Sequence, residues 1–237
     1  MDYEKGSTAS LIDTIYQTLL ARILSGELQP GDWLPAEREL AEQMSVSRSS
    51  LHNALTQLES EGFVSVEPRR GTIVTDYRKH PTPQSLSAVM NYSSFQIDEP
   101  LFRDLMALRL LVETECTRLA CTNFYDTTLA EMREIADLLE AEDADLAELI
   151  YRYHYLLTQA SGNSVYSMIF RGFETVIKVL VDRHYSLQAV DIREAAAMHR
   201  ELADHIERRD EAAAADCIRR ILLQGVSVLE GFYHTEE

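Results

Sequence analysis

The sequence predicts a mainly α-helical protein with two parts, a small N-terminal domain of three helices and one β-hairpin and a C-terminal bundle of helices alone. The chain has 237 residues, of which 46% are hydrophobic, enough for two separate cores. Apolar residues recur at three- and four-residue steps along most of the chain. Between residues 63 and 75 this spacing changes to the two-residue alternation of short strands.

The first two helices are predicted from apolar periodicity and from helix-stop and helix-start residues. An amphipathic helix is expected over Ser10–Ser25, and Gly26 after it is a stop signal. The segment Leu28–Asp32 has the composition of a turn. A short second helix is expected over Pro35–Met44, because proline suits the first helical position, where no amide donor is needed.

The third helix is predicted to begin after Ser47, whose hydroxyl can cap it, and to end near Gly62. Its inward face is expected to consist of four apolar side chains at helical spacing, Leu51, Ala54, Leu55 and Leu58. Two β-type runs, residues 63–66 and 72–75, then flank a basic turn. Helix, short helix, turn, helix and hairpin is the order of a winged helix-turn-helix, so residues 1–76 are predicted to form this domain.

The boundary between the two domains is predicted in residues 77–100, which hold three prolines and a cluster of serines. A short helix is expected near residues 85–90 of this linker. The remainder, residues 101–237, has helical periodicity throughout and predicts an all-α bundle. Its helices are expected near residues 101–123, 127–141, 144–161, 164–185, 189–208 and 210–232.

The formal charge of −17 argues at first against nucleic acid, because phosphate neutralisation supplies much of the affinity in such complexes. Residues 1–79, however, carry only −4 of this charge and the rest of the chain carries −13. The N-terminal arginines are also grouped, with Arg48 at a helix start and Arg69 and Arg70 together in the hairpin turn. The local field near these residues can therefore be positive despite the total charge.

The sequence predicts a cytoplasmic protein without a membrane partner. No stretch approaches the roughly 20 apolar residues of a membrane span, and the first residues lack the basic, apolar profile of a secretory signal. Cys116, Cys121 and Cys217 lie in helical sequence without metal-ligand spacing. We expect them to be reduced, buried packing residues.

The start of the third helix has the composition of a helix that enters the major groove, with short polar and arginine side chains opposite an apolar face. Arginine there can contact a guanine edge or a phosphate, while the basic hairpin tip can reach a minor groove or phosphates. A merely solvated helix start, a local salt bridge of Arg38 and a soluble turn are the alternatives. The predicted DNA-binding residues are Arg38, Ser47, Arg48, Ser49, Ser50, His52, Arg69, Arg70 and Gly71.

Residues 10–75 contain three motifs, Leu34-Pro-Ala-Glu-Arg-Glu-Leu-Ala, Val46-Ser-Arg-Ser-Ser-Leu and Arg70-Gly-Thr. In these motifs the segment resembles the N-terminal domain of the GntR family of regulators. The resemblance implies a winged helix that binds an operator palindrome as a dimer, with DNA contacts from the two helices and the wing. One position departs from the family, which usually has an arginine where this chain has His52. This departure implies an altered operator contact.

The C-terminal region contains a series of short motifs in chain order, namely Leu101-Phe-Arg-Asp-Leu, Leu108-Arg109 with Glu113, Ala147-Glu148-Leu149, Ala160-Ser-Gly-Asn163 with Tyr166, and Arg183-His184-Tyr185. Through these motifs it resembles the FadR subfamily, and within it the fatty-acid regulators, over about residues 100–225. The resemblance implies a helical effector-binding domain, whose ligand in those regulators is a long-chain acyl-CoA that releases the protein from DNA.

An acyl-CoA site needs an apolar tunnel for the chain and donors for the phosphates, and aromatic-rich helices with nearby cations can supply both. The alternative is that the aromatic residues are ordinary core and that Arg109 and Glu113, four apart, form only a helix-surface pair. The predicted effector-binding residues are Arg109, His154, Tyr166, Arg183, His184, Tyr185 and His199.

The resemblance also raises the question of a metal, because the subfamily often binds one through an aspartate, a histidine one helical turn later and two further histidines. Here His154 and His199 match two of the histidines, but Ile150 and Ile221 stand at the other two ligand positions. Two imidazoles are too few for a firmly held metal. No cofactor is therefore expected, and His154 and His199 are only weak metal candidates.

Together these patterns predict a homodimeric transcription regulator that binds double-stranded operator DNA and whose affinity is controlled by a small-molecule effector, with a fatty acyl-CoA as the leading candidate. The alternative within the same family is a metal-assisted sensor of a short organic acid. A metal-dependent hydrolase using His154, His199 and Glu148 is a third interpretation. The absence of any catalytic motif disfavours an enzyme.

Overall fold

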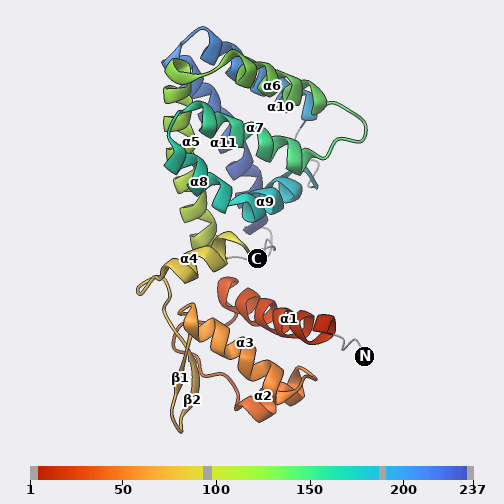
Figure 1. Cartoon of the computed structure of the whole chain (residues 1–237), viewed down its shortest axis with the longest axis vertical. Coiled ribbons are helices and arrows are strands. Elements are labelled where there is room, and N and C mark those ends of the chain that lie inside the picture. The colour runs from red at the N-terminus through yellow and green to blue at the C-terminus, as the bar shows by residue number, and fades with distance from the viewer. Residues whose placement is uncertain (1–4, 93–97, 187–190, 234–237) are drawn as a thin grey trace. The chain divides into compact units, whose positions relative to one another are not determined.

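The computed structural model of the chain describes residues 5–92, 98–186 and 191–233 (Figure 1). Residues 93–97 of the predicted linker, residues 189–190 of a predicted helix and the two chain ends lie outside the described residues. The chain divides into two compact units, Met1–Val89 with Gln96–Asp98 and Met90–Phe95 with Glu99–Glu237. We call them the N-terminal unit and the helical unit. The predicted mainly α-helical fold is confirmed.

The N-terminal unit has the predicted order of a winged helix-turn-helix. The helix α2 is shorter than expected, because Ala36 has extended backbone angles (φ −53°, ψ 142°) and the helix begins only at Glu37. Pro35 therefore precedes the helix rather than occupying its first turn. The elements are α1 (Lys5–Leu24), α2 (Glu37–Gln43), α3 (Arg48–Ser60), β1 (Val64–Glu67) and β2 (Gly71–Val74), followed by α4 (Pro83–Met90).

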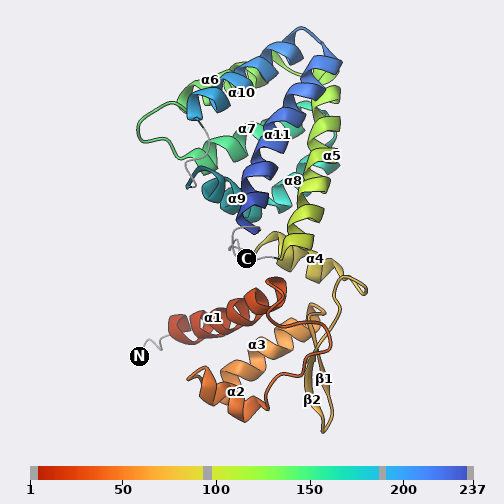
Figure 2. The ribbon, with the colours of Figure 1, turned by 180° about the vertical axis from the view of Figure 1, so that it is seen from behind.

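The core of the N-terminal unit forms where α1 packs along α3, as both views of the ribbon show (Figures 1 and 2). The predicted inward face of α3 is confirmed, since each of its four apolar side chains is at most 2% exposed. The apolar stripe of α1 covers this face through Ile15, Leu19, Leu20, Ile23 and Leu24. Burial of such side chains stabilises the fold by about 1.5–3 kcal/mol each. The packed face fixes which face of α3 remains exposed.

The hairpin pairs β1 and β2 antiparallel, with Val64 opposite Val74 and Glu67 opposite Gly71. Its turn requires left-handed backbone at Arg69 (φ 68°) and at Gly71 (φ 117°). The backbone conformation at Gly71 favours glycine, because residues with a side chain rarely adopt it. The turn thus places two arginines at the hairpin tip, as the sequence predicts.

The helical unit consists of helices alone. One predicted helix, residues 164–185, is wrong, because Gly172 ends α8 and the next residue, Phe173, leaves helical geometry (φ −91°, ψ 7°) before α9 begins. Glycine is a poor helix residue, so a break is easily accommodated there. The elements are α5 (Glu99–Asn123), α6 (Asp126–Leu138), α7 (Leu146–Ala160), α8 (Ser164–Gly172), α9 (Glu174–Ser186), α10 (Ile192–Glu207) and α11 (Glu211–Tyr233).

The bundle is organised around α5, which packs against α7 and α11, while α10 packs against α6 and α11 (Figures 1 and 2). Cys116, Cys121 and Cys217 are buried free thiols in this packing, as predicted. Burial raises the pKa of the Cys116 thiol to about 12, which keeps it in the unreactive protonated form. Within the described residues, no helix has both the length and the apolar character needed to cross a membrane.

Candidate functional site

The N-terminus of α3 presents two long polar side chains to solvent. Arg48 and His52 are 73% and 62% exposed, and both adjoin the carboxylate of Glu37 on α2. Nε of Arg48 lies 3.7 Å from Oε2 of Glu37, and Nδ1 of His52 lies 3.3 Å from Oε1. We call these three residues the surface trio. Exposed pairs of this kind contribute little to stability and exchange readily with other partners.

The cap of α3 forms as predicted, with the hydroxyl of Ser47 accepting the backbone N–H of Ser50 at 3.0 Å. Ser50 itself departs from the expected groove-facing position. It is only 5% exposed, and its hydroxyl lies 2.8 Å from that of Ser47. Ser49 remains exposed beside them. The two hydroxyls of Ser47 and Ser50 therefore complete the start of the helix.

Further cations lie on α2 and on the hairpin tip. The side chain of Arg38 is 83% exposed and only 4.0 Å from Glu42. Nη1 of Arg70 lies 2.6 Å from Oε2 of Glu67, and its guanidinium sits 4.9 Å from the centre of the Trp33 ring. The ring and the carboxylate both restrict where this arginine can point. Arg69, in the same turn, is exposed.

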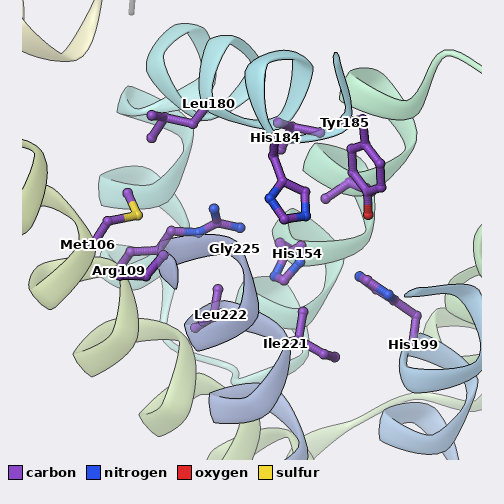
Figure 3. A pocket seen from close by; sticks show the side chains of 13 residues that line it. Met106, Arg109, His154, Leu180, His184, Tyr185, His199, Ile221, Leu222 and Gly225 are labelled. Carbon is purple, nitrogen blue, oxygen red and sulfur yellow. The ribbon is translucent and has the colours of Figure 1, made fainter. Parts of the chain in front are cut away.

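The helical unit contains a cavity of about 60 Å³ between α5, α7, α9, α10 and α11 (Figure 3). We call it the effector cavity. Five of the seven predicted effector-binding residues line it, whereas Tyr166 and Arg183 do not. Its lining consists of Met106, Arg109, Ile150, His154, Leu180, Val181, His184, Tyr185, His199, Ile221, Leu222, Gly225 and Val226.

A buried ionic group stands beside this cavity. Glu113 on α5 is fully buried and accepts hydrogen bonds from Nε of Arg109 and Nδ1 of His154. Burial alone raises the pKa of this carboxyl, but the positive Arg109 and then His154 outweigh that effect and lower the pKa to about 2. The interpretation of Arg109 and Glu113 as a helix-surface pair is wrong. We call the three residues the buried trio.

The buried trio directs the cation of Arg109 into the cavity. Because Glu113 engages Nε, the two terminal nitrogens of the guanidinium remain as donors. Figure 3 shows the guanidinium pointing toward His154 and His184. Burial, and secondly the positive charge of Arg109, lower the pKa of His184, and burial raises the pKa of Tyr185 to about 12. The cavity thus combines the cation of Arg109 with His184 and Tyr185, two polar groups whose charged forms are disfavoured by burial.

Two imidazole nitrogens at the cavity have no hydrogen-bond partner among the described residues, Nε2 of His199 and Nδ1 of His184. The other ring nitrogen of His199, Nδ1, lies 2.7 Å from the backbone oxygen of Ala195. Burial, with a smaller contribution from His154, lowers the pKa of His199 to about 3. Such unpaired, buried polar atoms are rare in native structures and call for an explanation.

The residues at the cavity do not fit the metal that the subfamily pattern implies. The rings of His154 and His199 are 5.5 Å apart between centres, and of the four ligand positions in the subfamily pattern only these two carry a side chain that can bind a metal. The apolar side chains of Ile150 and Ile221 line the same cavity at the other two ligand positions. Within the part of the chain that the structure describes, no three His, Cys, Asp or Glu residues are grouped for a metal.

A second, purely apolar depression adjoins the effector cavity and shares Met106 and Arg109 with it. We call it the apolar groove. Two aromatic side chains, Phe170 and Phe173, line this groove. Tyr153, by contrast, lies in the core, where its hydroxyl donates to the backbone oxygen of His199. The lining of the groove consists of Leu105, Met106, Leu108, Arg109, Val112, Ile169, Phe170, Phe173, Val176 and Ile177.

Two family models match the chain. The model for bacterial regulatory proteins of the gntR family matches residues 11–74, which include the surface trio and the hairpin. The model for the FCD domain matches residues 104–224, which include the buried trio and most of the effector cavity. Each match falls within one of the two predicted domains.

Curated relatives and solved structures agree with these matches. The transcriptional regulator Mce2R of Mycobacterium tuberculosis is 26% identical over 223 residues, 90% of this chain and 89% of that protein. The fatty acid metabolism regulator protein of Proteus mirabilis is 26% identical over 85% of this chain and 83% of its own length. The structure of Lar, described as controlling the Listeria monocytogenes agr system, covers 93% of this chain and 96% of its own, with 20% identity and a TM-score of 0.58. This last likeness shows the fold.

Proposed function

Since this chain belongs to the GntR family of bacterial regulatory proteins and carries an FCD domain, we propose that an organic anion in the effector cavity controls how tightly it binds its operator. The family and the named relatives are transcription regulators rather than enzymes. We assign operator binding to residues 1–76, the connection to residues 77–100, and effector binding and dimerisation to residues 101–237.

We assign the base contacts to the exposed N-terminal face of α3, with Arg48, Ser49 and His52 as the reading residues. The support is their exposure, together with the positive end of the helix dipole at the same place. We assign a contact with the phosphate backbone to Arg38 on α2, because its side chain is 83% exposed. His52 replaces the usual arginine of the family with a shorter donor, so its contact with DNA differs.

The wing contacts are assigned to the tip of the hairpin, where Arg69 and Arg70 precede Gly71. Trp33 and Glu67 hold the guanidinium of Arg70 from two sides, which favours contact with one phosphate over free movement. Ser47 and Ser50 contribute indirectly, by capping α3 and so fixing where Arg48 begins the helix.

The observation that carries the effector proposal is the cation of Arg109 directed into a cavity whose lining also has imidazole nitrogens without a hydrogen-bond partner among the described residues. A guanidinium with two free terminal nitrogens suits a carboxylate or phosphate oxygen, which accepts two parallel hydrogen bonds. Of the predicted residues, we assign contacts with this ligand to Arg109, His154, His184, Tyr185 and His199, because all five line the cavity. Tyr166 and Arg183 lie outside the cavity lining and are not assigned a contact.

The size of the cavity favours a compact organic acid. Ligand pockets commonly measure about 300–1,000 Å³, far more than the space of about 60 Å³ here. A small carboxylate therefore fits with little rearrangement, whereas a long acyl chain requires helices of the bundle to separate. This version needs no metal, because Arg109 already supplies the positive charge.

A fatty acyl-CoA is the second candidate, supported by the apolar groove and by relatives named fatty acid metabolism regulators. The groove is lined by apolar side chains and meets the effector cavity at Met106 and Arg109. An acyl chain along the groove would place its polar end at the same guanidinium. Both candidates therefore share an anionic or strongly polar group at Arg109.

We also propose that the protein acts as a homodimer in the cytoplasm, where its operator is. A palindromic operator matches the two-fold symmetry of a dimer. The exposed Leu111 on α5, 70% accessible, is an apolar side chain that a second copy could cover. Effector binding would change the separation of the two winged helices. A coupling free energy of only a few kcal/mol between effector binding and operator binding is enough to lower operator occupancy many-fold.

The test is release of a fluorescently labelled operator, taken from the DNA upstream of the gene, during titration with a long-chain acyl-CoA or with short organic acids. We expect release by one of the two classes in the wild type. The double variant Arg109→Met/Glu113→Gln removes both charges of the buried pair together and should bind the operator normally but lose the response. Arg118→Met, on the exposed side of the same helix, is the matched control and should respond like wild type. An unchanged response in the double variant would refute the role of Arg109.

A further inference from the structure

The proton on the His199 ring is placed by its backbone partner. Nδ1 lies 2.7 Å from the carbonyl oxygen of Ala195, and a carbonyl oxygen can only accept a hydrogen bond. Nδ1 must therefore carry the hydrogen. The ring is also 98% buried and neutral at physiological pH, because burial lowers its pKa to about 3. It follows that Nε2 carries a lone pair and no hydrogen.

None of the described residues donates a hydrogen bond to this lone pair. Nε2 of His199 is buried and without a partner, and the ring belongs to the lining of the effector cavity. Figure 3 shows the ring extending from α10 toward the space beside His154 and Tyr185. A buried acceptor left unpaired costs free energy, so a ligand that supplies a donor at this point gains affinity.

Nε2 of His199 and the cation of Arg109 belong to the same cavity, but they need different hydrogen-bond partners in a ligand. The guanidinium offers donors to an anionic oxygen, while Nε2 of His199 accepts from an O–H group. A simple carboxylate has no hydrogen to donate when ionised. A ligand that satisfies both groups therefore carries an anion and also a hydrogen-bond donor, which in an organic acid is most simply a hydroxyl.

We propose that the effector is a hydroxylated organic acid, whose anionic group binds Arg109 and whose hydroxyl donates to Nε2 of His199. This inference rests on the proposed function and narrows it to one class of ligand. His199 then acts as the residue that distinguishes a hydroxy acid from its deoxy analogue. A site built to bind a hydroxyl rejects the analogue without it more strongly than an apolar pocket rejects an extra hydroxyl.

The test compares acids that differ by one hydroxyl, with the full-length protein and isothermal titration calorimetry. The pairs are lactate with propionate, malate with succinate, and 3-hydroxydecanoate with decanoate, which cover short and fatty acids. In each pair of which either member binds, we expect the hydroxy acid to bind about tenfold more tightly or better. Equal affinities within all binding pairs would overturn the inference while leaving the anion proposal standing.

The variant His199→Phe removes the acceptor and keeps a ring of similar shape against Tyr153, whose ring centre is 4.6 Å away. We expect it to bind both members of a pair equally, with the deoxy acid bound as in wild type. His205→Phe, further along α10 and outside the cavity lining, is the matched control and should keep the preference. If His199→Phe does not fold, judged by its melting temperature, the wild-type comparison still decides.

Two further outcomes are decisive. Titration with Zn²⁺ alone should give no binding that depends on His199, and tight binding lost in His199→Phe would assign the lone pair to a metal and overturn the inference. If no acid of either kind binds, this inference fails, whereas the effector proposal is decided separately by the operator-release titration with a long-chain acyl-CoA and short organic acids. Operator binding, measured separately, would remain unaffected by that failure.

Discussion

Glu37 and Glu113 each lie between an arginine and a histidine, but in opposite environments. In the surface trio, Glu37 faces Arg48 and His52, whose side chains are 73% and 62% exposed. In the buried trio, Glu113 is fully buried and Arg109 is only 14% exposed. The chemical groups are the same, so the difference between the two sites lies in their access to water.

That difference sets what each group can do. At the surface, water screens the attraction, and a phosphate can replace the glutamate at little cost. Inside the bundle, the charges have been removed from water and each depends on the others, so no partner can leave. We infer that the surface trio is suited to reversible contact with DNA, and that the buried trio fixes the shape and charge of the effector cavity.

The largest expected effect is loss of stability on breaking the buried trio. Glu113→Gln leaves the charge of Arg109 without its counter-ion and should lower the free energy of unfolding by about 3 kcal/mol. Urea unfolding followed by circular dichroism measures this. Glu115→Gln removes an exposed carboxylate from the same helix and should change stability by less than about 0.5 kcal/mol. Equal losses of unfolding free energy in the two variants would show that the buried trio contributes no more to stability than an exposed ion pair.

The next effect concerns the exposed arginine of the surface trio. Arg48→Ala should weaken operator binding by about 1–3 kcal/mol, because a bidentate contact with guanine or a phosphate contact is lost. Its unfolding free energy should stay near that of wild type, as expected for an exposed pair. Fluorescence anisotropy with a labelled operator measures the affinity. Arg22→Ala, on α1 with Glu27 as its partner, is the control, and normal binding by Arg48→Ala would remove α3 from the interface.

The regular parts of the fold could be predicted because local signals determine them. The cap at Ser47 and the four-residue apolar face of α3 could both be predicted from the type and spacing of neighbouring residues. The break between α8 and α9 could not be predicted, because the hydrophobic pattern continues through Gly172 and only tertiary packing decides where the helix turns. The start of α2 was misplaced for a similar reason, since Pro35 is compatible with both extended and helical backbone.

The site could be predicted only in part. The sequence suggested Arg109, His154 and His199 through resemblance, and all three line the effector cavity. It did not indicate that Glu113 is buried, because a glutamate four residues after an arginine is far more often an exposed pair. Nor could it show that Ser50 turns inward to Ser47, since adjacent serines at a helix start differ only in which face they occupy.

The burial of His199 should also affect how stability depends on pH. The unfolded chain binds a proton at this histidine near pH 6.5, whereas the folded protein does not until about pH 3. Between these values stability should therefore fall as the pH falls. His199→Phe should remove about 1.4 kcal/mol per pH unit from this slope. Urea unfolding of the wild type and the variant at pH 4.5, 5.5 and 6.5 measures it, and equal slopes for the two proteins would contradict the prediction.

The smallest expected effect tests whether the surface trio is exchangeable. Glu37→Gln removes the carboxylate that competes with DNA phosphate for Arg48, so operator binding should become about two- to fivefold tighter, in line with the strength of an exposed pair. Stability should hardly change. Glu42→Gln, 4.0 Å from Arg38, is the control for a general loss of negative charge and should have a smaller effect. If Glu37→Gln instead weakens operator binding, Glu37 positions Arg48 for the operator. The surface trio would then be a fixed arrangement, in which the carboxylate holds the arginine as Glu113 holds Arg109.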